Sequence, residues 1–356
     1  SGYDGEDYFK ERGGELSVCR THAGDLWKEG WDGSWRPSYP CCLGVPMTHD
    51  IAEDFVRKIV DMGLDWVQFL DQNVGCCTFP CYATNHEHPP IPGRWMTEEM
   101  NNLLDTFDGI AAAEYQRTQG VRQIVFSVEC PINEYFIPRF HLCDVRVIPP
   151  GHYPGRRPAA IPLYHYLYHE FILIQGGFGY GPEPYHLPIR NAYNLVVGEI
   201  PGAVMKGDGR LLNKDTGNWA PWEPQVGDND DALQILKAAT ALRRGKGKDF
   251  LVYGRMLRPA DVQNIKMIHW QEGDDEHRIP AVFHSAWQAP DGRVGIVLAN
   301  WTTEVQEVCV VDERLGDKVL ASVSAEGMET KALSSTNGNF MITLPELSFI
   351  LLERLV

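Results

Sequence analysis

The sequence predicts an α/β protein, with strands of a (β/α)8-type barrel followed by a C-terminal antiparallel β-sandwich. The barrel is predicted because a helix-period segment, a glycine, a short apolar strand and a carboxylate follow one another twice, ending at Asp71 and at Glu129. The sandwich is predicted because short apolar or alternating strands, separated by turn residues, fill the chain from about residue 250. We therefore expect a barrel portion over residues 1–249 and a β-sandwich domain over residues 250–356.

Composition and charge restrict the class of partner. Hydrophobic residues make up 44% of the 356 residues and charged residues 22%, which is typical of a globular protein. The 48 acidic and 32 basic residues give a net charge of −16, which argues against nucleic-acid and anionic-membrane partners. No apolar run approaches the roughly 20 residues of a membrane span. A neutral substrate such as a carbohydrate fits this composition.

The nine cysteines do not form a recognisable framework. The chain is too long for a disulfide scaffold, although Cys76 or Cys77 could form a local bridge with Cys81. A metal site made from these three residues lacks the C-x-x-C spacing and a matching second pair. We therefore expect no metal and no other cofactor. The composition is compatible with a secreted or extracytoplasmic protein but does not decide the compartment.

The first helix–strand unit follows loops rich in glycine and tryptophan. Apolar residues at helical spacing predict a helix from Thr48 or His49 to Met62, and Gly63 ends it. The apolar run that follows predicts a buried strand ending at Asp71. In parallel sheets the carboxyl ends of the strands form the active-site face, so Asp71 is the first candidate functional residue.

The second unit repeats this order. Thr97 is the expected cap of a helix that ends at Gly120, and a β-branched strand then ends at Glu129. A third strand contains Asp144. Further helices are expected over residues 163–178, between residues 181 and 205, and over residues 231–245.

These units are too few for a complete barrel. Only three or four are clearly marked before residue 250, whereas a barrel of this type has about eight. We expect the earlier strands to be supplied by a second polypeptide or by an N-terminal segment that precedes residue 1.

Asp71 and Glu129 form the candidate catalytic pair. Two carboxylates at the ends of neighbouring parallel strands face each other across the mouth of a barrel. Glycoside hydrolysis needs such a pair, because one carboxylate attacks the anomeric carbon or activates water while the other protonates the leaving oxygen. The structural alternatives are a helix cap or loop ion pair for Asp71, and an ion pair with Arg139 or Arg146 for Glu129.

Several of these segments resemble a group of TIM-barrel glycoside hydrolases. They are the run DMGLDWVQFLDQ, the loop C-Y-x-x-x-H-x-H-P-P with GRW, the helix that follows, and the strand ending in S-V-E. The group includes bacterial glycosidase-like proteins and is similar to endo-α-N-acetylgalactosaminidases and, more distantly, to the α-amylase superfamily. The resemblance implies a retaining hydrolase of an α-linked glycan, with Asp71 as the nucleophile and Glu129 as the acid/base. It covers residues 40–150 and departs from the group at Gln72 and in lacking the early strands.

Other polar and aromatic residues are expected to bind the substrate. Histidine and arginine side chains can hydrogen-bond sugar hydroxyls, and tryptophan rings can stack on sugar faces. The candidates are Gln72, His86, His88, Arg94, Trp95, Asp144, Trp219 and Trp222.

The histidines leave two alternatives open. His86 and His88 form an H-x-H pair, which is also typical of amidohydrolase metal ligands, so a metal-dependent hydrolase is one alternative function. A carbohydrate-binding protein that has lost catalysis is the other. His165, His169 and Glu170 lie on one predicted helical face, where we expect an interior hydrogen-bond network rather than a set of metal ligands.

Overall fold

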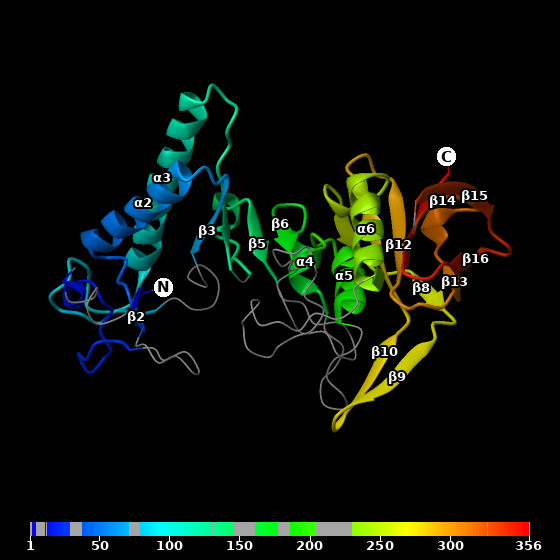
Figure 1. Cartoon of the computed structure of the whole chain (residues 1–356), viewed down its shortest axis with the longest axis horizontal. Helices are drawn as coiled ribbons and strands as arrows, with labels where there is room; N and C mark the ends of the chain where they lie inside the picture. The colour runs from blue at the N-terminus through cyan, green and yellow to red at the C-terminus, as the bar shows by residue number, and fades with distance from the viewer. Residues whose placement is uncertain are drawn as a thin grey trace. The chain divides into compact units, whose positions relative to one another are not determined.

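The chain forms two compact units, Ser1–Cys143 and Asp144–Val356, each with its own buried side chains (Figure 1). The computed structural model describes residues 2–4, 11, 13–28, 38–70, 79–129, 131–145, 161–176, 186–203, 230–325 and 327–355.

The first unit combines short strands with two long helices, α2 and α3, which pack side by side (Figure 1). Its regular elements are β1 (Gly2–Asp4), a 3-10 helix (Gly14–Leu16), β2 (Ser38–Pro40), α2 (Pro46–Asp61), β3 (Trp66–Leu70), α3 (Arg94–Arg117), β4 (Val125–Val128), a second 3-10 helix (Ile137–Arg139) and the start of β5 (Leu142–Asp144).

Both long helices begin earlier than predicted. α2 starts at Pro46, and the predicted cap Thr48 lies inside its first turn. Proline suits this position because its fixed φ is already helical and the first turn needs no N–H from it. α3 starts at Arg94 after Gly93, three residues before the predicted cap Thr97.

In the first unit, β3, β4 and β5 are parallel, as the alternation of helices and strands predicted, whereas β1 and β2 pair antiparallel. β3 pairs with β4 through Trp66 opposite Val125 and Leu70 opposite Val128, with a shift of register between Val67 and Leu70. β4 pairs in parallel with β5. Gly63 has a φ of 88°, a conformation suited to glycine, and it ends α2 as expected. In the described part of the chain, β3, β4 and β5 belong to an open parallel sheet that does not close into a barrel.

In the second unit, the helix predicted over residues 163–178 is divided. It consists of α4 (Leu163–Tyr168) and a separate strand, β6 (Leu173–Gln175). The strand forms because tertiary pairing outweighs local helix propensity. Ile174 is fully buried, and its carbonyl accepts a hydrogen bond from the Ile200 N–H at 2.8 Å. The remaining helices are α5 (His186–Val196), α6 (Asp230–Arg244) and α7 (Lys248–Leu251).

The C-terminal part consists of antiparallel sheets, as predicted. A six-stranded sheet has the order β15-β14-β17-β12-β11-β7, a three-stranded sheet has the order β16-β13-β8, and β9 and β10 form a hairpin. The strands are β7 (Arg255–Leu257), β8 (Asp261–Gln263), β9 (Met267–Glu272), β10 (Asp275–Pro280), β11 (Val282–Gln288), β12 (Val294–Asn300), β13 (Gln306–Val311), β14 (Lys318–Ser324), β15 (Met328–Ser334), β16 (Asn339–Leu344) and β17 (Ser348–Arg354).

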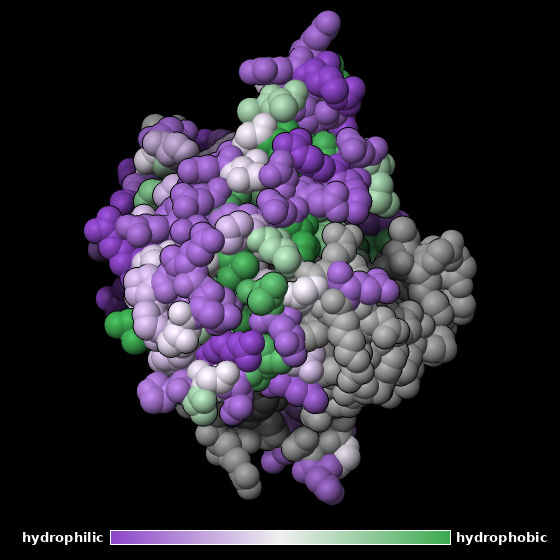
Figure 2. Space-filling view, turned by 90° about the vertical axis from the view of Figure 1, so that its left-hand side faces the viewer, coloured by the Kyte–Doolittle hydropathy of each residue, from purple (hydrophilic) through white to green (hydrophobic). Residues whose placement is uncertain are grey.

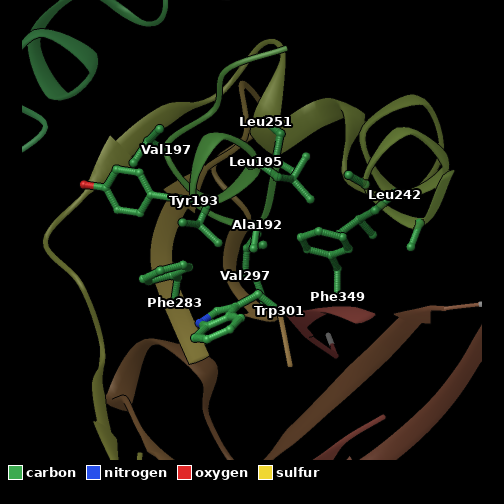
Figure 3. Close-up of a cluster of buried hydrophobic side chains, with 14 of the residues drawn as sticks. Ala192, Tyr193, Leu195, Val197, Leu242, Leu251, Phe283, Val297, Trp301 and Phe349 are labelled. Atoms are coloured by element: carbon green, nitrogen blue, oxygen red, sulfur yellow. The ribbon is translucent and has the colours of Figure 1, made fainter. Parts of the chain in front are cut away.

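The central strands of the six-stranded sheet, β12 and β17, are buried on both faces. Successive side chains of a strand point to opposite sides. In β12, Ile296 and Leu298 pack in the core shared with the three-stranded sheet, whereas Val297 and Ala299 pack on the helical side. There they meet residues of α5, α6 and α7, with the rings of Trp301 and Phe349 among them (Figure 3). The domain boundary expected between residues 249 and 250 stays a prediction.

The face of the molecule in Figure 2 is largely hydrophilic, with hydrophobic residues in small groups between polar ones. This agrees with the net charge of −16. In the described part of the chain, no helix is both long enough and apolar enough to span a membrane.

Candidate active site

Glu129 directly follows strand β4, which is firmly held in the first unit. The indole N–H of Trp66 on β3 donates to the Ser127 hydroxyl of β4 at 2.6 Å. Phe126 stacks with Phe107 of α3 at a ring distance of 5.5 Å. Val128 is fully buried and Glu129 is partly exposed, so the strand is anchored up to the point where the carboxylate begins.

The register of β3 and β4 matters for the predicted catalytic pair. Leu70, the last residue of β3, lies opposite Val128, the last residue of β4. Asp71 and Glu129 are the next residues in the sequence. Asp71 lies outside the described residues, as do three predicted substrate-binding residues, which are Gln72, Trp219 and Trp222.

Arg139, the ion-pair partner considered for Glu129, is engaged by α3. Its guanidinium donates to Asp105 at 2.7 Å, to Asp108 at 3.0 Å and to the side-chain oxygen of Asn101 at 3.0 Å. These contacts connect the segment after β4 to the helix before it.

The second unit contains a buried polar cluster that the sequence did not reveal. Glu199 is fully buried, and its Oε1 lies 2.8 Å from Nε2 of the equally buried His165. The Asn194 amide, oriented to satisfy its neighbours, donates to Glu199 Oε2 at 3.0 Å. Burial raises the pKa of Glu199, while His165 and the nearby Arg190 favour the carboxylate and the charge of Asp144 opposes it. Asp144, predicted to bind substrate, therefore lies within electrostatic reach of this cluster, and it is 4% exposed.

Only glycine fits at position 176, next to this cluster. A Cβ at this position would lie 2.4 Å from Glu199 Oε2 and closer still to the Asn194 amide. The polar groups therefore fill the space beyond the end of β6. The arrangement is closed to solvent, so it fits a structural role better than direct contact with a substrate.

The interior network expected around His165 and His169 is confirmed for these two residues. His169 is 5% exposed, and its Nδ1 and Nε2 lie 2.9 Å and 3.1 Å from the carbonyl oxygens of Gly254 and Gly198. Its ring packs edge-on against Trp287. Glu170, which we expected in the same network, is exposed.

Burial lowers the pKa of His169 to about 4, and the nearby charges of Arg243 and His165 lower it further. The hydrogen bonds to the two carbonyl oxygens raise the pKa, but their effect is smaller than that of burial. The unfolded chain therefore takes up a proton at this residue first as the pH falls below about 6.5. Stability rises with pH wherever the unfolded state binds more protons. His169 alone should therefore contribute a loss of about 3 kcal/mol of stability between pH 6.5 and pH 4, because one pKa unit corresponds to about 1.36 kcal/mol.

Urea unfolding at a series of pH values measures this loss. The His169→Gln variant should have a flatter profile over that interval. Parallel profiles for the variant and the natural chain would show that acid sensitivity arises elsewhere.

The two histidines of the H-x-H pair lie largely inside the first unit. His88 is 8% exposed and His86 is partly buried. With Cys42 and Cys81 they form a group whose candidate ligand atoms all lie within 4.8 Å of one another. This group could hold a metal ion. Cys81 is a free thiol, and its two suggested disulfide partners lie outside the described residues.

Arg94 and Trp95, at the start of α3, point to different surroundings. Arg94 is highly exposed and pairs with Glu98 one turn along the helix at 2.7 Å. Trp95 stacks on His88 at a ring distance of 3.7 Å, and its indole N–H donates to the Ile91 carbonyl at 2.8 Å. The structure thus brings Trp95 to the histidine pair and leaves Arg94 in solvent. The sugar-binding roles predicted for both residues and for the histidines stay predictions.

Comparison with known proteins identifies the fold. No curated protein matches the chain. Among solved structures, the maltogenic α-amylase AmyB from Thermotoga neapolitana has a TM-score of 0.57 at 10% identity, covering 98% of this chain and 74% of the other. An Anoxybacillus α-amylase has a TM-score of 0.51 at 10% identity, covering 99% and 74%. The chain therefore has a fold of the glycoside hydrolase type, in agreement with the resemblance seen in its sequence. The specific relation to endo-α-N-acetylgalactosaminidases stays a prediction.

A family model extends this comparison to the sequence itself. The model described as "Domain of unknown function (DUF6259)" matches residues 3–180. The match includes β3, β4 and β5, the loop with the H-x-H pair, and both members of the predicted catalytic pair. The chain therefore belongs to the DUF6259 family.

Proposed function

We propose that this protein is a retaining glycoside hydrolase that acts on an α-linked glycan, with Asp71 as the nucleophile and Glu129 as the acid/base. The observation that carries the proposal is the register of two parallel strands, in which Leu70 lies opposite Val128. Both strands end at the same edge of the sheet, and in α/β barrels the catalytic groups follow such strand ends. The glycosidase-type fold supports the same reaction class.

In the proposed reaction, an Asp71 carboxylate oxygen attacks the anomeric carbon and the glycosidic C–O bond breaks. Glu129 gives its proton to the departing oxygen, so the leaving group departs as a neutral alcohol. The Glu129 carboxylate then takes a proton from water, and the resulting attack on the anomeric carbon releases Asp71. Two carboxyl groups about 5–5.5 Å apart are required for this double displacement.

The alternatives have less support. A metal-dependent hydrolase would need an open coordination position for water, whereas the His86–His88 group already offers four protein ligand atoms. A carbohydrate-binding protein without catalysis would share the fold but would release no product.

The test uses a panel of α- and β-linked aryl glycosides and oligosaccharides, with proton NMR to identify the anomer released first. We expect hydrolysis of an α-linked member with retention of configuration. The Asp71→Asn variant should be inactive, because the amide cannot form the glycosyl ester. Release of the inverted anomer, or full activity in Asp71→Asn, would contradict the mechanism. Glycan binding without hydrolysis would indicate the binding protein instead.

A further inference from the structure

The first unit contains a compact group of thiol and imidazole side chains that the proposed reaction does not use. Cys42 and Cys81 are 1% and 0% exposed, and His88 is 8% exposed. With His86 they offer four ligand atoms within 4.8 Å of one another. The group lies beneath Trp27, Phe79 and Trp95, which shield it.

The distances within the group fit a tetrahedral metal site. Cys42 Sγ lies 3.1 Å from His88 Nε2, and Cys81 Sγ lies 3.5 Å from His86 Nδ1. A tetrahedral zinc ion with usual bond lengths separates a sulfur and a nitrogen ligand by about 3.5 Å. The side chains are therefore spaced as ligands of one ion would be.

His88 is prepared in the protonation state that a ligand needs. Its Nδ1–H donates to the Pro89 carbonyl oxygen at 2.7 Å, which leaves the Nε2 lone pair directed toward Cys42. A hydrogen bond from the other ring nitrogen is the usual way in which proteins orient a metal-binding histidine. The stacked ring of Trp95 fixes the imidazole plane. At Gly44, a Cβ would lie 2.4 Å from the His88 ring, so only glycine leaves room for this orientation.

Cys81 and His86 complete the group. The backbone N–H of Arg20 donates to Cys81 Sγ at 3.4 Å, and such donors stabilise a thiolate. His86 faces Cys81 through Nδ1, while its Nε2 is buried without a hydrogen-bond partner among the described residues.

We propose that Cys42, Cys81, His86 and His88 bind one zinc ion in a structural site. Two thiolates and two imidazoles form a ligand set typical of zinc, and the two negative charges balance the ion, which permits burial. Four protein ligands leave no open position, so the ion does not activate water. Cys19 lies outside the ligand set, and its thiol donates to the carbonyl oxygen of Phe79 at 3.8 Å. The proposal differs from the expectation of a metal-free protein drawn from local cysteine spacing.

The zinc ion would join two segments that are distant in the sequence. Cys42 lies just before α2, and the other three ligands lie in the loop that leads into α3. The buried apolar core here is small, consisting of Cys19, Cys42, Cys81 and Ala83. Metal binding can supply folding free energy where a core is insufficient. The ion would thus fix the loop that connects β3 to α3.

The test measures metal content and coordination, so it is independent of glycosidase activity. The full chain, purified with zinc in the medium, should contain one zinc ion per chain. After replacement by Co²⁺, it should show thiolate-to-cobalt charge-transfer bands and the strong visible bands of a tetrahedral site. The Cys42→Ala and His88→Ala variants should bind zinc at least about 100-fold more weakly. Cys309→Ala is the matched control, because Cys309 is also a buried free thiol but lies in β13, and it should retain the ion.

A second measurement does not depend on the folding of the ligand variants. Chelation of zinc from the natural chain should lower the Tm, and added zinc should restore it. The Gly44→Ala variant keeps all four ligands, but it should bind zinc about 10- to 100-fold more weakly because it displaces His88. Absence of stoichiometric zinc together with failure to take up Zn²⁺ or Co²⁺, an octahedral cobalt spectrum, or a disulfide between Cys42 and Cys81 in the unreduced protein would each overturn the proposal.

Discussion

Replacing Glu129 by alanine should lower kcat/KM on an α-linked oligosaccharide by about 10²- to 10⁴-fold, the usual contribution of a general acid. The loss should be much smaller for an aryl glycoside whose leaving group needs no proton. With that substrate the second step becomes limiting, because no base activates water. Added azide, a nucleophile that needs no base, should therefore restore turnover and yield a glycosyl azide of retained configuration.

Glu134→Ala is the matched control for this experiment. Glu134 is exposed and follows the same strand, so its loss should leave kcat/KM unchanged. An equal loss on both substrates in Glu129→Ala, without azide rescue, would indicate that Glu129 supports the fold rather than the reaction. Steady-state kinetics and mass spectrometry of the azide product decide between these outcomes.

Replacing Glu199 by alanine should destabilise the protein by about 3–5 kcal/mol, since it leaves buried partners without their acceptor. His165 Nε2 and the Asn194 amide both face this carboxylate. Glu199→Gln keeps the shape and should cost much less. Burial raises the pKa of Glu199, so the folded state holds this proton more tightly than the unfolded chain does. Glu199 should therefore contribute a loss of stability as the pH rises above about 4.3, up to the folded pKa, which is opposite in sign to the contribution of His169, and the glutamine variant should lack the Glu199 contribution.

Urea unfolding of single and double variants of Glu199 and His165 measures the coupling. We expect the double variant to be less destabilised than the sum of the two single variants, because the two residues share one interaction. Glu170→Ala, at an exposed position near α4, should stay within about 0.5 kcal/mol of the natural chain. Additive effects at Glu199 and His165 would show that the pair is not coupled.

The parallel α/β pattern could be predicted because the local periodicity of apolar residues indicates each helix and strand. The helix-period segment before Gly63, the glycine and the apolar run after it determine α2 and β3 without reference to the rest of the chain. The first residues of the helices were harder to predict from the sequence. Thr48 and Thr97 are residue types that favour the N-cap, but α2 begins at Pro46 and α3 begins directly after Gly93.

Tertiary pairing explains the main error in secondary structure. The aromatic segment after Leu163 has helical spacing, yet Ile174 and its neighbours form β6. Hydrogen bonding to Ile200 and complete burial determine the outcome there. The local sequence does not indicate that the pairing partner of this strand lies after the next helix.

The candidate sites show the same limit. The H-x-H pair was visible, and Cys81 precedes it in the same loop, but Cys42 comes from a distant segment and spacing alone could not assign it. Glu199 follows a helix rather than a predicted strand, so the rule that led to Glu129 did not select it. A search for Cys-x4-His-x-His would have marked three of the four proposed zinc ligands.

Burial of the central strands of the six-stranded sheet on both faces has an evolutionary consequence. Alternate residues of β12 and β17 pack in two different cores, one on each face of the sheet. A substitution in these strands must therefore be compatible with the helices on one face or with the three-stranded sheet on the other. Recombination that exchanged only the C-terminal strands would deprive α5 and α6 of their apolar cover. We therefore expect these helices and strands to be inherited as one block across relatives, even where the preceding loops diverge.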